Sequence, residues 1–343
     1  TDKGNHVEAE LVEIVSPSPL RRDLPCRHYA ACGGCQLQHL TYAAQCAIRR
    51  EFVAEPLARA GVITSSNFDF VPSPFEMGYR TRLQLAVTEG KVGFNRRRSN
   101  DLVEIDGCPL CLPELGEAIP MLRAYVNRTG SSAAPMGQIF AVAGENGAVA
   151  AEPPPDGSWP REVRWTVGRI RYHLTPDVFF QANAHLLDAF QSVVCDDISG
   201  GTAVDLFGGT GFFALPLARS FKEVTVIEEH RPAVALGKRN AKEAGIGNVR
   251  FIPSRVEDLD VEEFGQKPDF AVVDPPRAGL SNKAFKVLNA LAPERIMYVS
   301  CDHVSLARDL KKLVDRGWKV SRLTVLDIFP QTYHVETVAY LTR

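Results

Sequence analysis

The chain has 343 residues, of which 45% are hydrophobic and 23% charged, and its formal net charge is −2. This composition is ordinary for a globular protein and argues against a disordered chain, and the length suggests about two domains. No stretch approaches the ~18 uncharged apolar residues of a membrane-spanning helix. The first residues lack the basic and apolar segments of a signal peptide. We therefore expect a cytoplasmic protein that acts as a monomer, with no membrane contact and no obligate protein partner.

The N-terminal half combines a cysteine cluster with short β-rich runs. Residues 7–15 form a β-like piece, and residues 42–60 are predicted to form a helix that could pack on either domain. Residues 68–180 alternate β-rich runs with turn residues, as expected of a small β-rich domain.

Almost all basic residues up to Phe179 are arginine, including Arg80, Arg82 and the run Arg96-Arg97-Arg98. Guanidinium groups suit phosphate oxygens and stack on bases. This bias is a weak indication of RNA binding, because a GC-rich genome that prefers arginine to lysine explains it equally well.

From Gly200 onward, strands and helices alternate regularly, which predicts an α/β fold with a parallel, doubly wound sheet. The expected strands are residues 203–207, 223–228, 249–252, 270–274 and 296–300, with helices that include 231–244 and 304–316. Two further strand-like runs close the chain, at 320–326 and 335–341. A final antiparallel hairpin on a parallel sheet is typical of class I methyltransferases, whereas dehydrogenases continue in parallel.

A glycine-rich turn, Asp205-Leu-Phe-Gly-Gly-Thr-Gly211, follows the first of these strands and opens a helix. Glycines such as Gly209 and Gly211 let a backbone approach a ligand closely, although tight packing alone would also require them. Glu228 ends the next strand, where a carboxylate can bind ribose hydroxyls. This order of features predicts a nucleotide or S-adenosylmethionine site. The DxFxGxG form favours S-adenosylmethionine over NAD.

Asp274-Pro-Pro-Arg277 ends the fourth strand, where the prolines stiffen the turn. The turn would place a carboxylate and backbone carbonyls beside a transferred methyl group, and the alternative is a simple strand-to-loop connection. Methyltransferases that act on exocyclic amines usually follow this turn with an aromatic residue. Arg277 takes that place here, which counts against amine methylation.

Cys301 and Glu336 are suited to covalent catalysis on a pyrimidine. Cys301 ends a predicted strand at the sheet edge where doubly wound folds bind ligands, and Glu336 lies in the last apolar strand. A thiolate that adds to C6 of uracil makes C5 nucleophilic enough to accept a methyl group, and a carboxylate can then remove the C5 proton. We expect the dipole of the helix after Cys301 to lower the thiol pKa. The alternatives are a packed cysteine and a strand-face charge. The Asp274 turn has no cysteine, which favours uracil over cytosine.

Cys26-x5-Cys32-x2-Cys35, together with a distant cysteine, is sufficient to ligate a metal centre. Four thiolates can hold a [4Fe-4S] cluster or a zinc ion. The two CxxC pairs, which end at Cys35 and Cys111, are typical of zinc sites and support the zinc alternative. Because methyl transfer is redox-neutral, such a centre would serve folding and the presentation of RNA-binding loops.

The motifs together resemble those of the bacterial RNA 5-methyluridine (uracil-C5) methyltransferases, and the likeness covers almost the full chain. The matching pieces are Cys26-x5-Cys32-Gly-Gly-Cys35-Gln-Leu-Gln-His39, Phe179-Phe-Gln-Ala-Asn183, Asp205–Gly211, Asp274-Pro-Pro-Arg-Ala-Gly279, Val299-Ser-Cys301-x5-Ala307-Arg-Asp309 and Phe329-Pro-Gln-Thr-Tyr-His-Val-Glu336-Thr. The resemblance implies an enzyme that uses S-adenosylmethionine on structured RNA. It favours the iron–sulfur branch that acts on 23S rRNA, because the tRNA-directed branch tends to lack the cysteine cluster.

The resemblance also implies roles for individual residues. Cys301 would be the nucleophile and Glu336 the base that abstracts the proton. The expected contacts with S-adenosylmethionine are Gln181, Phe207, Gly209, Gly211, Glu228 and Asp274. The expected ligands of the [4Fe-4S] cluster are Cys26, Cys32, Cys35 and Cys108, which leaves Cys111 free.

The chain departs from the family pattern at a few positions. Phe212 and Arg255 replace polar residues that often contact the cofactor. Asp302 and His303 replace the usual Asn-Pro after the nucleophile, which puts the local turn in question.

The expected domains are a remnant or linker at 1–25, an iron–sulfur and β-rich RNA-binding domain at 26–180, and a catalytic domain at 181–343. Residues 7–15 would be at most the last strand of an N-terminal β-barrel that relatives carry. Two alternative functions stay open: a tRNA 5-methyluridine methyltransferase and a catalytically inactive iron–sulfur RNA-binding protein. The presence of both Cys301 and Glu336 argues against the inactive protein.

Overall fold

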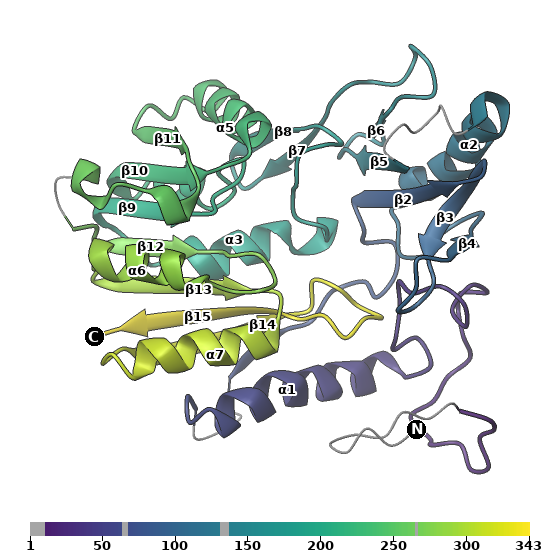
Figure 1. The fold of residues 1–343 in the computed structure, drawn as a ribbon, viewed down its shortest axis with the longest axis horizontal. Coiled ribbons are helices and arrows are strands. Elements are labelled where there is room, and N and C mark those ends of the chain that lie inside the picture. The colour runs from purple at the N-terminus through teal and green to yellow at the C-terminus, as the bar shows by residue number, and fades with distance from the viewer. Residues whose placement is uncertain (1–10, 64–67, 131–136, 265–266) are drawn as a thin grey trace.

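The computed structural model describes residues 11–63, 68–130, 137–264 and 267–343. Its large sheet has eight strands (Figure 1), in the order β1 (Asp69–Val71), β14 (Lys319–Leu326), β15 (Glu336–Thr342), β13 (Arg295–Ser300), β12 (Phe270–Val273), β9 (Gly200–Leu206), β10 (Phe221–Glu228) and β11 (Val249–Pro253). Neighbouring strands are parallel except that β15 runs antiparallel to β13 and β14. The predicted class I fold, with its antiparallel C-terminal strand, is confirmed.

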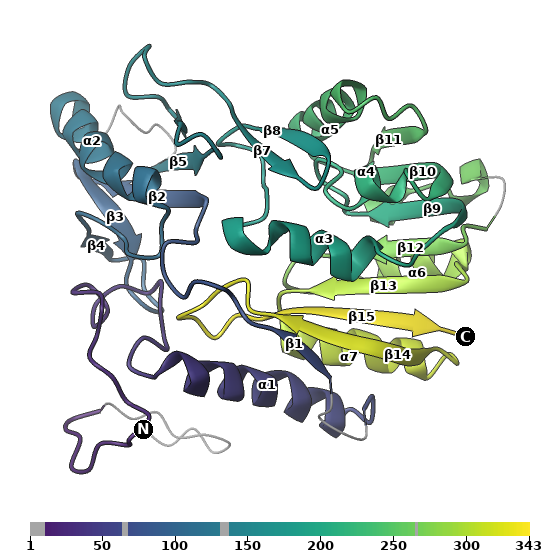
Figure 2. The same ribbon diagram turned by 180° about the vertical axis from the view of Figure 1, so that it is seen from behind.

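Helices cover both faces of this sheet because successive strand residues point to opposite sides. Along β12, Phe270 and Val272 pack on one face, whereas Ala271 and Val273 pack on the other. The first face is covered by α3 (Leu187–Cys195), α4 (Ala214–Leu217) and α5 (Arg231–Glu243). The second is covered by α1 (Tyr42–Arg59), α6 (Asn282–Leu291) and α7 (His303–Val314). Figure 2 shows α3 in front of the sheet, and Figure 1 shows α1 and α7 on the opposite side.

A smaller antiparallel sheet lies at one end of the large one (Figure 1), in the order β4 (Leu102–Glu104), β3 (Lys91–Asn95), β2 (Arg82–Thr88), β5 (Gln138–Ala143) and β6 (Val149–Glu152). Helix α2 (Pro113–Thr129) packs on it through an apolar core of its own. The hairpin of β7 (Val163–Val167) and β8 (Ile170–Leu174) packs against the first face of the large sheet beside α5. Short 3-10 turns lie at Ala184–Leu186, Val256–Asp258 and Val261–Phe264.

The predicted strands and helices after Gly200 match the observed elements to within a few residues. The β-like piece at 7–15 does not: residues 7–10 lie outside the described residues, and residues 11–15 form no strand. Propensity suggested a strand there, but the described part has no partner strand to supply ladder hydrogen bonds. No helix among the described residues is both long and apolar enough to cross a membrane.

Candidate active site

A cavity of about 780 Å³ opens beyond the C-terminal ends of the parallel strands. Ligands bind at this edge in doubly wound folds because the loops that follow the strands gather there. The cavity brings together six of the residues predicted from the sequence, namely Gln181, Phe207, Glu228, Asp274, Cys301 and Glu336.

The glycine-rich turn after β9 is tightly packed from below. A Cβ atom at Gly208 would lie 2.6 Å from Val226 Cγ1 and 2.8 Å from Asp205 Cγ, closer than real contacts allow. The predicted glycines that follow, Gly209 and Gly211, have φ angles of 53° and 81°, a region that side chains rarely adopt. Gly208 therefore has no room for a side chain and the conformations of Gly209 and Gly211 favour glycine, although Phe207 in the same turn also has a positive φ, of 65°.

Glu228 binds this turn from the end of β10. Its carboxylate accepts hydrogen bonds from the backbone N–H of Gly209 at 2.9 Å and of His230 at 2.7 Å. Deeper in the site, both carboxylate oxygens of the buried Asp205 have no hydrogen-bond partner. Burial, followed by the charges of Asp274 and Glu228, raises the Asp205 pKa far above its usual value. Asp205 does not line the cavity and lies beneath the turn, next to Gly208.

Cys301 and Glu336 stand opposite each other at the ends of two neighbouring strands. In the antiparallel pair of β13 and β15, Ser300 faces Thr337, so the next position on β13 is Cys301 and its counterpart on β15 is Glu336. Glu336 is only 5% exposed, so it is not a solvated charge on a strand face. The two candidate catalytic groups therefore lie side by side at the cavity wall.

The pKa of the Cys301 thiol is raised to about 12, mainly by burial and then by the charges of Glu336 and Asp274, while Arg277 acts in the opposite direction. Our expectation of a lowered pKa is therefore wrong for the unliganded protein. Burial and the two nearby carboxylates outweigh the opposing charge of Arg277. Burial raises the pKa of Asp274 to about 7, and burial and Asp274 together raise that of Glu336.

The unusual residue after the nucleophile has a clear structural role. Asp302 caps α7, since its carboxylate accepts hydrogen bonds from the backbone N–H groups of Ser305 at 2.8 Å and Val304 at 3.2 Å. Aspartate is among the preferred N-cap residues. The turn is therefore well formed in spite of its departure from the family pattern.

Two other departures have different outcomes. Phe212 is buried among Tyr172, Phe180 and Phe190, so it belongs to the core and not to the cavity. Arg255 lines the cavity, where its guanidinium lies 3.8 Å from a Glu229 carboxylate oxygen.

The cavity also contains residues that sequence reasoning did not single out as site residues. His334 shares a hydrogen bond of 3.2 Å with the Arg277 guanidinium, and burial followed by Arg277 lowers its pKa to about 4. Phe179 lines the same wall and is 66% exposed, which is unusual for a large aromatic side chain. Both stand in matching motifs, but only the fold shows that they face the cavity.

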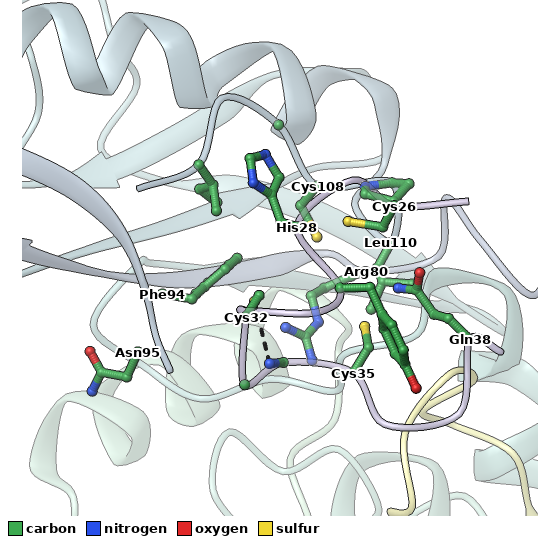
Figure 3. Close-up of a pocket in the computed structure, with 16 residues that line it drawn as sticks. Cys26, His28, Cys32, Cys35, Gln38, Arg80, Phe94, Asn95, Cys108 and Leu110 are labelled. Atoms are coloured by element: carbon green, nitrogen blue, oxygen red, sulfur yellow. Dashed lines mark hydrogen bonds between the residues drawn. The ribbon is translucent and has the colours of Figure 1, made fainter. Parts of the chain in front are cut away.

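The four predicted cluster ligands line a second cavity, of about 240 Å³ (Figure 3). Cys111 does not line it, so the two CxxC pairs do not converge there. Among the described residues, no three His, Cys, Asp or Glu side chains could hold a metal ion, and all eight cysteines are free thiols. Arg80 lines this cavity and the first one as well.

Comparison with known proteins places the chain in a family. The family model described as tRNA (uracil-5-)-methyltransferase matches residues 162–343. The 23S rRNA (uracil(1939)-C(5))-methyltransferase RlmD of Alkalilimnicola ehrlichii is 32% identical, with 98% of this chain and 86% of that protein covered. The enzyme of that name from Pseudomonas entomophila is also 32% identical, with 98% and 84% covered.

A solved structure agrees with these sequence matches. The Pyrococcus abyssi tRNA (uracil-54, C5)-methyltransferase, in complex with S-adenosyl-L-homocysteine, has a TM-score of 0.75 and 27% identity. The match covers 96% of this chain and 88% of that one. The chain therefore belongs to the RNA (uracil-5-)-methyltransferase family.

Proposed function

We propose that the chain methylates C5 of a uridine in 23S rRNA, with Cys301 as nucleophile and Glu336 as base. The observation that carries this proposal is the position of the two side chains. They lie side by side, where β13 ends and β15 begins, in the same cavity as the cofactor turn. A catalytically inactive RNA-binding protein would not need a half-buried thiol beside a buried carboxylate.

The chemistry follows from the poor nucleophilicity of uracil C5. The Cys301 thiolate adds to C6, and the electron pair that leaves the C5–C6 double bond becomes available at C5. S-Adenosylmethionine, when bound, would supply the electrophilic methyl group that C5 takes up, and the electron pair of the broken C–S bond would stay on sulfur in neutral S-adenosylhomocysteine. The Glu336 carboxylate then accepts the C5 proton, the C5–C6 double bond re-forms, and the C6–S bond breaks to free Cys301.

The charges in the cavity fit a cationic cofactor. The pKa values of three groups that line the cavity, Asp274, Cys301 and Glu336, are raised in the unliganded protein. A positive charge near these groups favours their ionised forms. Gln181, Phe207, the turn at Gly209 and Gly211, Glu228 and Asp274 would hold S-adenosylmethionine, whose sulfonium supplies such a charge.

For the cysteine site we propose a [4Fe-4S] cluster on Cys26, Cys32, Cys35 and Cys108. The four residues share one cavity, which gathers the four thiols that such a cluster needs. A multi-iron cluster takes one thiolate per iron, whereas zinc needs four ligands around one point. The cluster would stabilise the cysteine loop, residues 26–35, and would take no chemical part in methyl transfer.

We place part of the RNA-binding surface next to this cluster. Cys32 forms a β-bridge with Arg96, and the N–H of Gly33 donates to the carbonyl of Asn95 at 3.0 Å. The exposed run Arg96–Arg98 is thereby attached to the cysteine loop. Arg82 differs, because its guanidinium donates to the carbonyl oxygens of Val178 and Pro176 and so has a structural role.

We retain the division into residues 1–25, 26–180 and 181–343 as a proposal for domain organisation. In this division, helix α1 and strand β1 belong to the central domain in sequence but pack on the sheet of the catalytic domain. A monomer in the cytoplasm fits an enzyme that meets large RNA substrates.

The proposed substrate rests on the two RlmD relatives and on the cysteine cavity, whereas the Pyrococcus abyssi structure favours tRNA as the second candidate. The target uridine must leave its stack to reach Cys301. Incubation with S-adenosylmethionine and unmodified transcripts, followed by nucleoside mass spectrometry, tests the proposal. We expect 5-methyluridine in 23S rRNA. If it appears in tRNA transcripts alone, the substrate assignment is wrong and the chemistry stands.

A further inference from the structure

The loop between β14 and β15 ends at the proposed base and reaches away from the sheet towards the N-terminal segment (Figures 1 and 2). At its tip, Gln331 is fully buried and has a φ of 71°. Residues other than glycine rarely adopt this conformation. Such backbone strain persists only where the surrounding structure holds it, and it is a frequent mark of functional sites.

Two segments hold the backbone of Gln331. Its carbonyl oxygen accepts hydrogen bonds from the N–H groups of Gln36 and Leu37, both at 2.9 Å. Its own N–H donates to Oε1 of Gln45, in α1, at 3.0 Å. The backbone is thus bonded both to the stretch that directly follows Cys35 and to the helix beyond it.

The Gln331 side chain is bonded just as completely. Its Oε1 accepts from Gln45 Nε2 at 2.9 Å and from Arg22 Nη2 at 3.0 Å. Its Nε2 donates to Glu76 Oε2 at 3.0 Å and to the Glu76 carbonyl oxygen at 3.2 Å. Every hydrogen-bonding atom of Gln331 is therefore in use, and each partner lies in the first 76 residues.

These contacts connect the segments that flank the cysteine loop, residues 26–35, to the catalytic loop, residues 327–335. Arg22 stands just before the cysteine loop and Gln36 directly after it, so both ends of that loop meet at Gln331. Glu336 follows the catalytic loop as the first residue of β15. Cys301 stands at the end of β13, outside this contact. A change at Gln331 should displace the base and leave the nucleophile in place.

We propose that Gln331 is a positioning residue for the proton-abstraction step, through which the cysteine loop holds Glu336 in place. The inference rests on the proposed function, in which Glu336 takes the C5 proton and Cys301 leaves C6. In this proposal the cysteine site helps to position the catalytic base, a role that requires no redox chemistry.

The test is Gln331→Met, which keeps the length of the side chain and the backbone hydrogen bonds and removes the side-chain hydrogen bonds. We expect the Cys301–RNA adduct to form at nearly the wild-type rate. Release of 5-methyluridine should slow about 10-fold, equivalent to about 1.4 kcal/mol, so that the adduct accumulates during turnover on a denaturing gel. Gln84→Met is the matched control, because Gln84 bonds to Gln138 on the exposed side of the small sheet, and it should behave as wild type.

Arg22→Met is the second variant, in case Gln331→Met does not fold. The Arg22 side chain is partly exposed, so its loss should disturb the fold less. It should show the same selective delay in release. Equal losses in adduct formation and release in both variants would overturn the inference, as would unchanged release. If Glu336→Gln accumulates adduct while these variants do not, the inference fails and the proposed function stands. Continued methylation by Cys301→Ala would instead overturn the proposed function.

Discussion

The Cys301 thiol is a poor nucleophile in the unliganded protein, because burial and two carboxylates raise its pKa to about 12. Far fewer than one thiol in a thousand is then ionised at pH 7. Activation by a bound cation would make nucleophilic attack depend on prior cofactor binding. Such an order would protect the thiol from other electrophiles until both substrates are present.

This dependence on charge can be measured at the thiol itself. The pH at which Cys301 is half-ionised should lie well above 9 without ligand, as judged from the pH dependence of iodoacetamide alkylation by peptide mass spectrometry. An analogue with a protonated amine in place of the sulfonium should shift that midpoint to lower pH, whereas the uncharged S-adenosylhomocysteine should shift it less. Cys46, outside both cavities, is the internal control. A midpoint near 9 or below without ligand would contradict the argument.

The division of labour between the catalytic pair predicts opposite phenotypes. Glu336→Gln should form the covalent adduct and fail to resolve it, because an amide cannot accept the C5 proton. Cys301→Ala should bind S-adenosylmethionine normally and form no adduct, with product formation reduced by at least about 10⁴-fold. Denaturing gels and isothermal titration calorimetry distinguish the two. Normal turnover by Glu336→Gln would mean that another group is the base.

At the scale of elements, the cofactor turn after β9 is the least tolerant segment of the site. Gly208→Ala would place a methyl group 2.6 Å from Val226 and 2.8 Å from Asp205, which typically costs about 1–3 kcal/mol in a packed interior. We expect the dissociation constant for S-adenosylmethionine to rise at least about 10-fold. Gly247→Ala is the control, because nothing lies within 4 Å of its Cβ. An unchanged affinity in Gly208→Ala would show that the turn can relax.

The strand–helix pattern after Gly200 was predictable because each strand of a parallel sheet is a local apolar run with turn-forming residues at both ends. The site residues at strand ends were predictable for the same reason, since topology brings such ends together. The contacts of Gln331 were not, because its partners lie in the first 76 residues. Nor was the pairing of β1 with β14, since a strand of three residues carries no periodic signal.

At the scale of the whole molecule, a buried ion pair joins the two ends of the chain. Arg49 in α1 and Asp327 at the end of β14 are both 0% exposed, with Nη1 and Oδ2 3.4 Å apart. Arg49 Nε also donates to the carbonyl oxygen of Thr332 at 3.1 Å, in the catalytic loop. The pair therefore fixes α1, the sheet and the catalytic loop to one another.

Arg49→Met should lower the free energy of unfolding by about 3–5 kcal/mol, because it leaves the buried Asp327 without its cationic partner and with only the Tyr42 hydroxyl to bond it. Arg59→Met, on the same helix, removes an exposed pair with Glu55 and should cost at most about 1 kcal/mol. Burial already raises the pKa of Asp327 in the folded protein. The Arg49→Met penalty should therefore shrink as the pH falls and Asp327 takes up a proton. Urea unfolding at pH 8 and pH 5 checks both; equal losses in the two variants would contradict the argument.

The packing of α1 against the loop between β14 and β15 also affects the order of folding during synthesis. Gln45 and Gln331 are separated by 286 residues, so α1 leaves the ribosome roughly 15–60 s before its partner loop at translation rates of about 5–20 residues per second. During this interval the apolar side of α1, with Val53 and Leu57, has no sheet to cover. The nascent chain therefore leaves this apolar side uncovered until β14 and β15 have been made.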